Sequence, residues 1–215
     1  MDGPAASGKG TIAAELGRIY ALPVLDSGLL YRAVGMTLLG EGGDLGDEAA
    51  AAAAARRLDP ARVDDPAFRT RAAGEAASRV APYPGVREAL RDFQRAFARR
   101  PGGAVIDGRD IGTVIVPEAP AKLYVTASPE ARARRRWLQL QTGDAAVTYD
   151  EVLADIRRRD ARDAGRAEAP MRPADDAVLL DTTEMSISAA ADAARRIVEA
   201  ARARWEPSPA RDPPG

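Results

Sequence analysis

The residues from Gly3 to Thr11, GPAASGKGT, have types and spacing that suit the binding of nucleotide phosphates. They fit Gly-x4-Gly-Lys, in which the glycines let backbone N–H groups turn inward around phosphate oxygens and the next helix adds its positive end. Lys9 can reach the outer phosphates as a point charge. We therefore expect nucleotide binding by Gly3, Ala5, Ala6, Ser7, Gly8, Lys9, Gly10 and Thr11.

The residue after Lys9 determines which atoms are expected to hold magnesium. The general phosphate-loop pattern places Ser or Thr there to hold Mg²⁺. This chain has Gly10 at that position, and its hydroxyl comes one residue later, at Thr11. We expect Mg²⁺ to be held mainly by phosphate oxygens and water, so no side chain is assigned as a metal ligand.

The composition limits the chemistry available elsewhere in the chain. Its 215 residues are enough for one α/β domain with a sizeable core. It has no cysteine and no histidine, which excludes disulfides, thiol nucleophiles, imidazole catalysis and most zinc sites. The net charge is −1, and no signal peptide or membrane-length apolar run is visible. We expect a cytoplasmic protein whose partners include neither nucleic acid nor a membrane.

Apolar segments typical of strands alternate with helical segments. The strand candidates are 23–26, 104–107, 122–126 and 178–181. The helical candidates are 9–20, 48–58, 85–100, a segment that follows Ser128 as its N-cap, a segment that opens with a capping box at Thr148, and 188–205. This alternation predicts an α/β fold with a parallel sheet flanked by helices on both faces.

Three of the four strand candidates end in aspartate, and ligands in open α/β sheets bind outside the carboxyl ends of strands. Asp26 and Asp107 precede glycine-containing turns, SGLLYR and GRDIG, which favours a place at the site. Asp181 precedes TTEMS, and for this residue we favour a turn or helix-capping role.

Arginine-rich segments in the second half of the chain have two interpretations each. Arg159, Asp163 and Arg166 share one face of the helix from Thr148, where they form either part of a site or a surface ion-pair ladder. The run Arg134–Arg136 is functional, or else it is a solvated helix face or a weak nucleic-acid patch. Tyr31, Trp137 and Trp205 are assigned to packing.

Six segments, in this order and spacing, together resemble the bacterial cytidylate kinase family: GPAASGKGT, LDSGLLYRA, EAASRVA, VREAL…FQRAF, DGRDIGTV and RRRDARDAGR. The resemblance extends from about Asp2 to Arg204. It implies the P-loop nucleoside monophosphate kinase fold, with a parallel-sheet core, a monophosphate-binding insert and a short arginine-bearing lid. It also implies phosphate transfer from ATP, with Mg²⁺, to CMP or dCMP.

The resemblance also implies roles for individual residues. Ser78, Arg87 and Asp110 read the cytosine, whose amino donor and two acceptors suit a carboxylate beside an arginine. Ser27, Arg159 and Asp163 hold the sugar. Arg32, Arg109 and Arg166 clamp the α-phosphate of CMP. A phosphate oxygen is its own nucleophile, so catalysis rests on positioning and charge neutralisation; we assign it to Lys9, Arg109 and Arg136, with help from Arg134 and Arg135.

The expected organisation is a single kinase domain over 1–204. The core spans about 1–31 and 86–204, the insert about 32–85 and the lid about 130–146. The proline-rich segment 206–215 is expected to be disordered. The protein is expected to be a monomer.

The chain departs from the family pattern at two places. Only Met1 and Asp2 precede the loop, so the strand that normally lies behind it is expected to be missing or truncated, and we expect the native start to lie upstream. The insert is short at 58–65, where many members carry extra strands. We expect activity to survive that shortening.

Two other functions remain open. A shikimate- or gluconate-type kinase has a hydroxyl acceptor without a base, and would leave Ser78, Arg87 and Asp110 without a purpose. A nucleotide-binding switch or a degenerate, non-catalytic module is the second alternative. The chain has no NKxD-like sequence of the kind that reads guanine, which disfavours a GTP switch.

Overall fold

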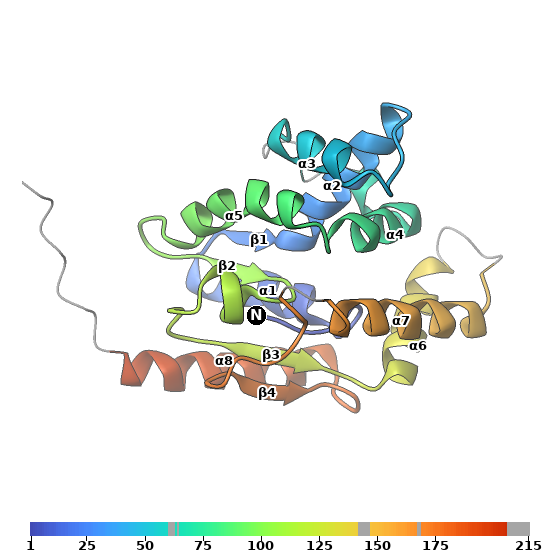
Figure 1. The fold of residues 1–215 in the computed structure, drawn as a ribbon. Coiled ribbons are helices and arrows are strands. Elements are labelled where there is room, and N and C mark those ends of the chain that lie inside the picture. The colour runs from blue at the N-terminus through green and yellow to red at the C-terminus, as the bar shows by residue number, and fades with distance from the viewer. Residues whose placement is uncertain (60–62, 64, 142–146, 167–168, 206–215) are drawn as a thin grey trace, which may run out of the picture.

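The computed structural model describes residues 1–59, 63, 65–141, 147–166 and 169–205. The four predicted strands are confirmed as β1 (Val24–Asp26), β2 (Val105–Asp107), β3 (Leu123–Thr126) and β4 (Val178–Asp181). They form two parallel pairs, β1 with β2 and β3 with β4. The carboxyl ends of all four strands face the same way, because Asp2 forms parallel bridges to both pairs (Figure 1).

The backbone of Met1 and Asp2 joins these two pairs. Asp2 forms bridges to both Gly108 and Tyr124, and the Met1 ammonium donates to the Ile106 carbonyl at 2.7 Å. The Asp2 side chain accepts from the N–H groups of Ile111 and Gly112, both at 2.7 Å. The strand expected to be missing is thus represented by two residues, and the phosphate loop starts from the centre of the sheet.

Helices cover the strands on both sides (Figure 1). On one side lie α1 (Lys9–Tyr20), which contacts β1 and β2, and α8 (Ile187–Arg204), which contacts α1 and β4. Their core with β3 and β4 includes Ile12, Leu16, Val125, Leu180 and Ala194. On the other side lie α2 (Ser27–Gly40) and α5 (Pro84–Ala98), with Leu30, Val34, Val86, Ile106 and Ile115 in the larger core. The prediction of a parallel sheet flanked by helices is confirmed.

Helix α2 corrects a sequence prediction. The segment SGLLYR was expected to be a glycine-containing turn, but it opens a 14-residue helix whose N-cap is Asp26. The Asp26 carboxylate accepts from the N–H of Gly28 at 2.9 Å, which satisfies one of the free donors at a helix start. The second predicted turn, GRDIG, leads into the short π-helical segment η3 (Ile111–Ile115).

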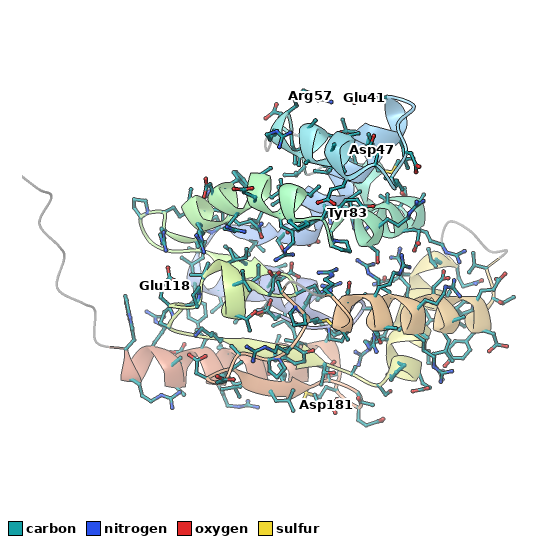
Figure 2. The ribbon with its side chains drawn as sticks, in the orientation of Figure 1. Glu41, Asp47, Arg57, Tyr83, Glu118 and Asp181 are labelled. Carbon is teal, nitrogen blue, oxygen red and sulfur yellow. The ribbon has the colours of Figure 1, made fainter. Side chains whose placement is uncertain are left out.

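The segment expected to be the insert is helical in its described part. It contains α3 (Glu48–Arg56), η2 (Pro66–Arg69) and α4 (Arg71–Val80); residues 60–62 and 64 lie outside the described residues. Helix α4 packs closely on α2, because a Cβ at Gly35 would come within 2.7 Å of the Ala76 Cβ. Arg57 pairs with Glu41 at 2.9 Å, and Tyr83 donates to the Leu45 carbonyl at 3.0 Å (Figure 2). These contacts tie α3 to the helices around it.

The segment expected to be the lid includes α6 (Pro129–Leu140), which packs on α7 (Tyr149–Ala164). The predicted caps are present: Ser128 accepts from Ala131 at 3.2 Å, and Thr148 with Glu151 forms a capping box. Residues 142–146 and 206–215 lie outside the described residues. Within the part of the chain that the structure describes, no helix has both the length and the apolar composition needed to cross a membrane.

Candidate active site

A cavity of about 1160 Å³ opens at the carboxyl ends of the strands. The phosphate loop and the start of α1 line one side of it, and the opposite side comes from α4, α6 and α7. Its polar lining includes Lys9, Asp26, Arg32, Asp107, Arg136 and Arg159. The edge of the sheet that was expected to bind a ligand is therefore where the cavity lies.

The phosphate loop has a backbone that leaves donors for a ligand. Gly3 has φ 145° and lies so close to β3 that a Cβ there would come within 2.0 Å of the Val125 carbonyl oxygen. Gly8 has φ 89° and is the N-cap of α1, without a side-chain cap. Among the described residues no side chain therefore caps the first N–H groups of α1, and an anion is the partner that such a helix end attracts.

Lys9 and Asp107 are buried side by side at this loop. Burial lowers the pKa of Lys9 to about 8, and the charge of Arg109 acts in the same direction, while Asp107 and Asp26 oppose it. Burial raises the pKa of Asp107 to about 6, and Lys9 opposes that shift. The Lys9 ammonium lies 3.4 Å from the Pro4 carbonyl oxygen, so it is held inside the loop.

Three arginines crowd together opposite Lys9. A Cβ at Gly74 on α4 would lie 3.5 Å from Nη1 of Arg159 and 3.6 Å from Nη2 of Arg32, so these two guanidinium groups converge on one spot. Burial lowers the pKa of Arg159 to about 9, and the charge of Arg109 adds to the effect. Among the described residues, no acceptor reaches the buried Nε of Arg159. This concentration of positive charge suits an anion.

Asp163 orients two of the predicted clamp arginines. It is buried and accepts from Nε of Arg109 at 2.9 Å and from Arg166. Burial disfavours its charge, but Arg109 and Arg166 hold the pKa of Asp163 below its usual value. The surface-ladder interpretation of Arg159, Asp163 and Arg166 is wrong, because the Asp163 and Arg166 side chains are only 1% and 6% exposed.

The predicted base-reading residues lie deeper than the cavity wall. Arg87 and Asp110 form a direct ion pair, with side chains 5% and 7% exposed. Burial raises the pKa of Asp110, and Arg87 opposes the shift. Ser78 is buried on α4, and its hydroxyl has no partner within the described chain. The structure brings Arg87 and Asp110 together and leaves Ser78 as a separate, unpaired hydroxyl.

The remaining predicted residues fall into two groups. Ser27 donates to the Asp107 carbonyl at 2.7 Å, which places it at the ends of β1 and β2. On α6, Arg136 lines the cavity and Arg135 donates to the Thr182 hydroxyl at 3.0 Å. Arg134 is exposed and does not line the cavity, so the run of three arginines is divided between the site and the solvent.

Sequence reasoning missed Arg132 and Thr182. Arg132 donates to the phosphate-loop carbonyl of Ala5 at 3.2 Å, and Thr182 donates to that of Ser7 at 2.9 Å. Arg132 stands beside three other arginines in an Arg-rich chain, so its type carried no signal. Asp181, for which a turn was favoured, accepts from the N–H of Thr183 at 2.8 Å and lies at the margin of the molecule (Figure 2).

A phosphate loop on a parallel sheet, facing a buried cluster of arginines across one cavity, defines a P-loop phosphotransferase of the nucleoside monophosphate kinase class. The family model described as "Cytidylate kinase" matches residues 1–200. The chain therefore belongs to the cytidylate kinase family.

Curated relatives align with this chain over nearly their whole length. The chain is 67% identical to "Cytidylate kinase" of Caulobacter sp. (strain K31), over 95% of each chain. It is 64% identical to that of Caulobacter vibrioides (strain NA1000 / CB15N), over 95% of this chain and 96% of the relative. It is 61% identical to that of Xanthobacter autotrophicus (strain ATCC BAA-1158 / Py2), over 94% of this chain and 97% of the relative.

Proposed function

We propose that this protein transfers the γ-phosphate of ATP to CMP or dCMP, giving ADP and CDP or dCDP. The observation that carries the proposal is the pair of converging guanidinium groups, Arg32 and Arg159, across the cavity from the phosphate loop. Arginine forks suit phosphate oxygens. Two phosphate-binding regions that face each other across one cavity are what a phosphate donor and a phosphate acceptor require.

The donor binds through the residues of the loop from Gly3 to Thr11. Backbone N–H groups of the loop and of the start of α1 hold the phosphate oxygens. Lys9, already held inside the loop, contacts the outer phosphates. Arg136 reaches the same space from α6 and neutralises charge on the transferred group.

The oxygen atoms on the phosphate-loop side of the cavity suit Mg²⁺. Asp107 has a buried Oδ1 with no partner among the described residues, and its Oδ2 faces Gly10, where a Cβ would lie 3.5 Å away. Asp107, Asp26 and the Thr11 hydroxyl offer oxygen atoms that can hold the water around Mg²⁺, whose direct ligands are expected to be mainly phosphate oxygens and water. When bound, Mg²⁺ neutralises charge on the transferred phosphate. The loop, Lys9 and these oxygens keep the donor in one orientation.

The acceptor binds between α4, α7 and the turn after β2. Arg32, Arg109 and Arg166 hold the phosphate of CMP, and Asp163 keeps the latter two in place. Ser27 and Asp163 hold the sugar together with Arg159, whose guanidinium also lies beside that of Arg32, where the phosphate binds. No base is needed, because a phosphate oxygen of CMP is already anionic near neutral pH, so the arginines align it and reduce repulsion with the donor.

The base is recognised by the buried pair Arg87 and Asp110 and by the unpaired Ser78 hydroxyl on α4. The Asp110 carboxylate accepts from the amino group of cytosine, and Arg87 donates to its ring nitrogen and carbonyl. Uracil offers a carbonyl in place of the amino group. A carboxylate facing that carbonyl leaves two buried acceptors unpaired, so UMP is disfavoured.

Several organisational points belong to the same proposal. The core comprises about 1–31 and 86–204, the insert about 32–85 and the lid about 130–146, within one kinase domain. The protein acts as a monomer in the cytoplasm, with nucleotides and neither nucleic acid nor membranes as partners. The ion pairs between α4 and α7, Arg71 with Asp155 and Glu75 with Arg162, support an insert that closes against the helix carrying Arg159.

The test is ADP release by the purified protein with ATP and Mg²⁺ against CMP, dCMP, UMP, AMP and shikimate. We expect turnover with CMP and dCMP well above the rest. Equal turnover with shikimate, or turnover with UMP as fast as with CMP, would contradict the proposed acceptor. Tight binding of ATP without transfer to any acceptor would indicate a non-catalytic nucleotide-binding protein.

A further inference from the structure

The proposed function assigns no role to Arg132, yet this residue contacts three separate parts of the molecule. Its side chain is only 4% exposed and does not line the cavity. Its Nε donates to the Ala127 carbonyl at 2.8 Å, and its Nη1 donates to the Ala5 carbonyl at 3.2 Å. The same guanidinium makes a two-point contact with the Asp160 carboxylate, at 3.0 Å and 2.6 Å. A planar fork is needed to satisfy all of these acceptors at once.

The contact with Ala5 bears on the shape of the phosphate loop. In a trans peptide the C=O and N–H point in opposite directions. Because Arg132 holds the Ala5 carbonyl from outside the loop, the Ala6 N–H is directed away from Arg132, to the side where the loop lines the cavity. Ala6 has φ 60°, which an L-residue adopts at a cost of roughly 1 kcal/mol or more. This peptide therefore needs support from outside the loop.

The contact with Asp160 joins the loop to the acceptor side. Asp160 lies on α7, next to Arg159 and three residues before Asp163. Arg132 thus connects the peptide that faces the donor with the helix that carries residues proposed to face the acceptor. A carboxylate at this place also fixes the guanidinium plane, since both oxygens of Asp160 are used.

We propose that Arg132 and Asp160 are a positioning pair for the phosphate donor. Arg132 holds the Ala5–Ala6 peptide in its strained orientation, and Asp160 holds Arg132. Neither residue touches the reacting atoms. The inference deepens the proposed function, because it names the groups that keep the phosphate loop in its binding conformation.

The chain offers a matched control in the same two helices. Arg157 on α7 pairs with Glu130 on α6 at 2.7 Å, but their side chains are 60% and 53% exposed. This second pair also links α6 to α7, and among the described residues neither of its side chains hydrogen-bonds to the phosphate loop. Exposed pairs of this kind contribute about 0–1 kcal/mol to stability. The variants Glu130→Gln and Arg157→Lys therefore repeat the chemistry of Asp160→Asn and Arg132→Lys without the contact with Ala5.

The experiment measures the dissociation constant of a non-hydrolysable ATP analogue with Mg²⁺ by calorimetry, and the KM for ATP and for CMP separately. Asp160→Asn and Arg132→Lys should weaken analogue binding by about ten-fold or more, because contacts with charged groups are lost. The KM for CMP should change by no more than about two-fold, and so should every constant for Glu130→Gln and Arg157→Lys. The double variant Arg132→Lys/Asp160→Asn should bind the analogue no more weakly than whichever single variant binds it less tightly, because both changes break the same interaction.

The proposal is overturned if both site variants bind the analogue as the unaltered protein does. It is also overturned if binding of the analogue and the KM for CMP change by the same factor with a lowered melting temperature, since that is a general loss of structure. Analogue binding is measured without any acceptor. It therefore judges the positioning pair even if CMP turns out not to be the substrate.

Discussion

At the scale of single residues, burial works against the charge of Lys9 at the phosphate loop. Lys9 has a pKa of about 8 in the free protein because it is buried near Arg109. A bound phosphate adds negative charge beside it and favours the charged form. Its pKa must therefore rise when a nucleotide binds, and protons must be taken up at any pH between the free and the bound value.

This gives a first prediction, for binding of a non-hydrolysable ATP analogue at pH 8. About half a proton should be taken up per analogue bound, and affinity should fall as the pH rises above 8, because Lys9 is then partly neutral before binding. Calorimetry in buffers with different ionisation enthalpies measures the uptake. Lys9→Arg, whose guanidinium stays charged, should remove it; uptake that persists in this variant would assign the proton to another group.

The second prediction concerns base selection by Asp110. Asp110→Asn should lower kcat/KM for CMP by about 10–100-fold, because the carboxylate that pairs with Arg87 and accepts from the cytosine amino group is lost. The ratio of kcat/KM for CMP to that for UMP should shrink, since an amide can donate to the uracil carbonyl. Steady-state kinetics with both nucleotides measure the change.

The control for this variant is Asp192→Asn, an exposed aspartate on α8, which should leave both values unchanged. Breaking a buried ion pair can cost about 3–5 kcal/mol, so thermal denaturation must show that Asp110→Asn is still folded at the assay temperature. An unchanged ratio of CMP to UMP in the folded variant would contradict the assignment of Asp110 to the base.

At the scale of elements, α4 sets how closely the arginines can gather. Gly74 lies in the middle of α4 and faces Arg32 and Arg159, with room for a Cβ at ordinary contact distance. Glycine inside a helix costs about 0.8–1 kcal/mol relative to alanine. Its place here is explained if the space beside it is used by the phosphate of the acceptor.

The third prediction follows from that helix. Gly74→Ala should raise the stability of the free protein by up to about 1 kcal/mol and should raise the KM for CMP several-fold, because the methyl group occupies the space that the phosphate oxygens need. Chemical denaturation and steady-state kinetics measure the two effects. A more stable variant with an unchanged KM for CMP would place the acceptor phosphate elsewhere.

Helix α2 shows a kind of element that local sequence patterns do not predict. The strands and capped helices were predicted because apolar runs and caps such as Ser128 and Thr148 are local signals. Helix α2 was taken for a turn because it starts with Ser27-Gly28 and is buried on most sides, which removes the periodic pattern of an amphipathic helix. Its cap, Asp26, was noticed only as a strand end.

The residues of the site were also predicted only in part from local patterns. The phosphate loop is contiguous, so its spacing was visible in the chain. Arg87 and Asp110 were recognised only through the resemblance to a family, and the structure shows them paired. Arg132 and Thr182 hold the loop across more than 100 residues of chain, and no local pattern reports such contacts.

At the scale of the whole molecule, two residues join the two halves of the sheet. The backbone of Asp2 pairs with both sides, and its carboxylate accepts from two buried N–H groups, those of Ile111 and Gly112. The larger core around α2 and α5 is thereby linked to the smaller core between α1 and α8.

The fourth prediction is that Asp2→Ala lowers the free energy of unfolding by about 2–6 kcal/mol, because two buried donors lose their acceptor at about 1–3 kcal/mol each. Asp2→Asn keeps one acceptor oxygen and should cost less. Urea denaturation followed by circular dichroism measures both. If Asp2→Ala unfolds at the same urea concentration as the unaltered protein, the side chain is not the link described here.

The scarcity of lysine gives this protein a built-in spectroscopic reporter. Lys9 and Lys122 are its only lysines, and they lie at opposite ends of the sheet: Lys9 at the phosphate loop, and Lys122 just before β3, bound to Asp176 at 2.6 Å. Isotope labelling of lysine alone would give one side-chain signal from the site and one from a place remote from it. The first would report donor occupancy and the second would serve as an internal reference, without any substitution in the chain.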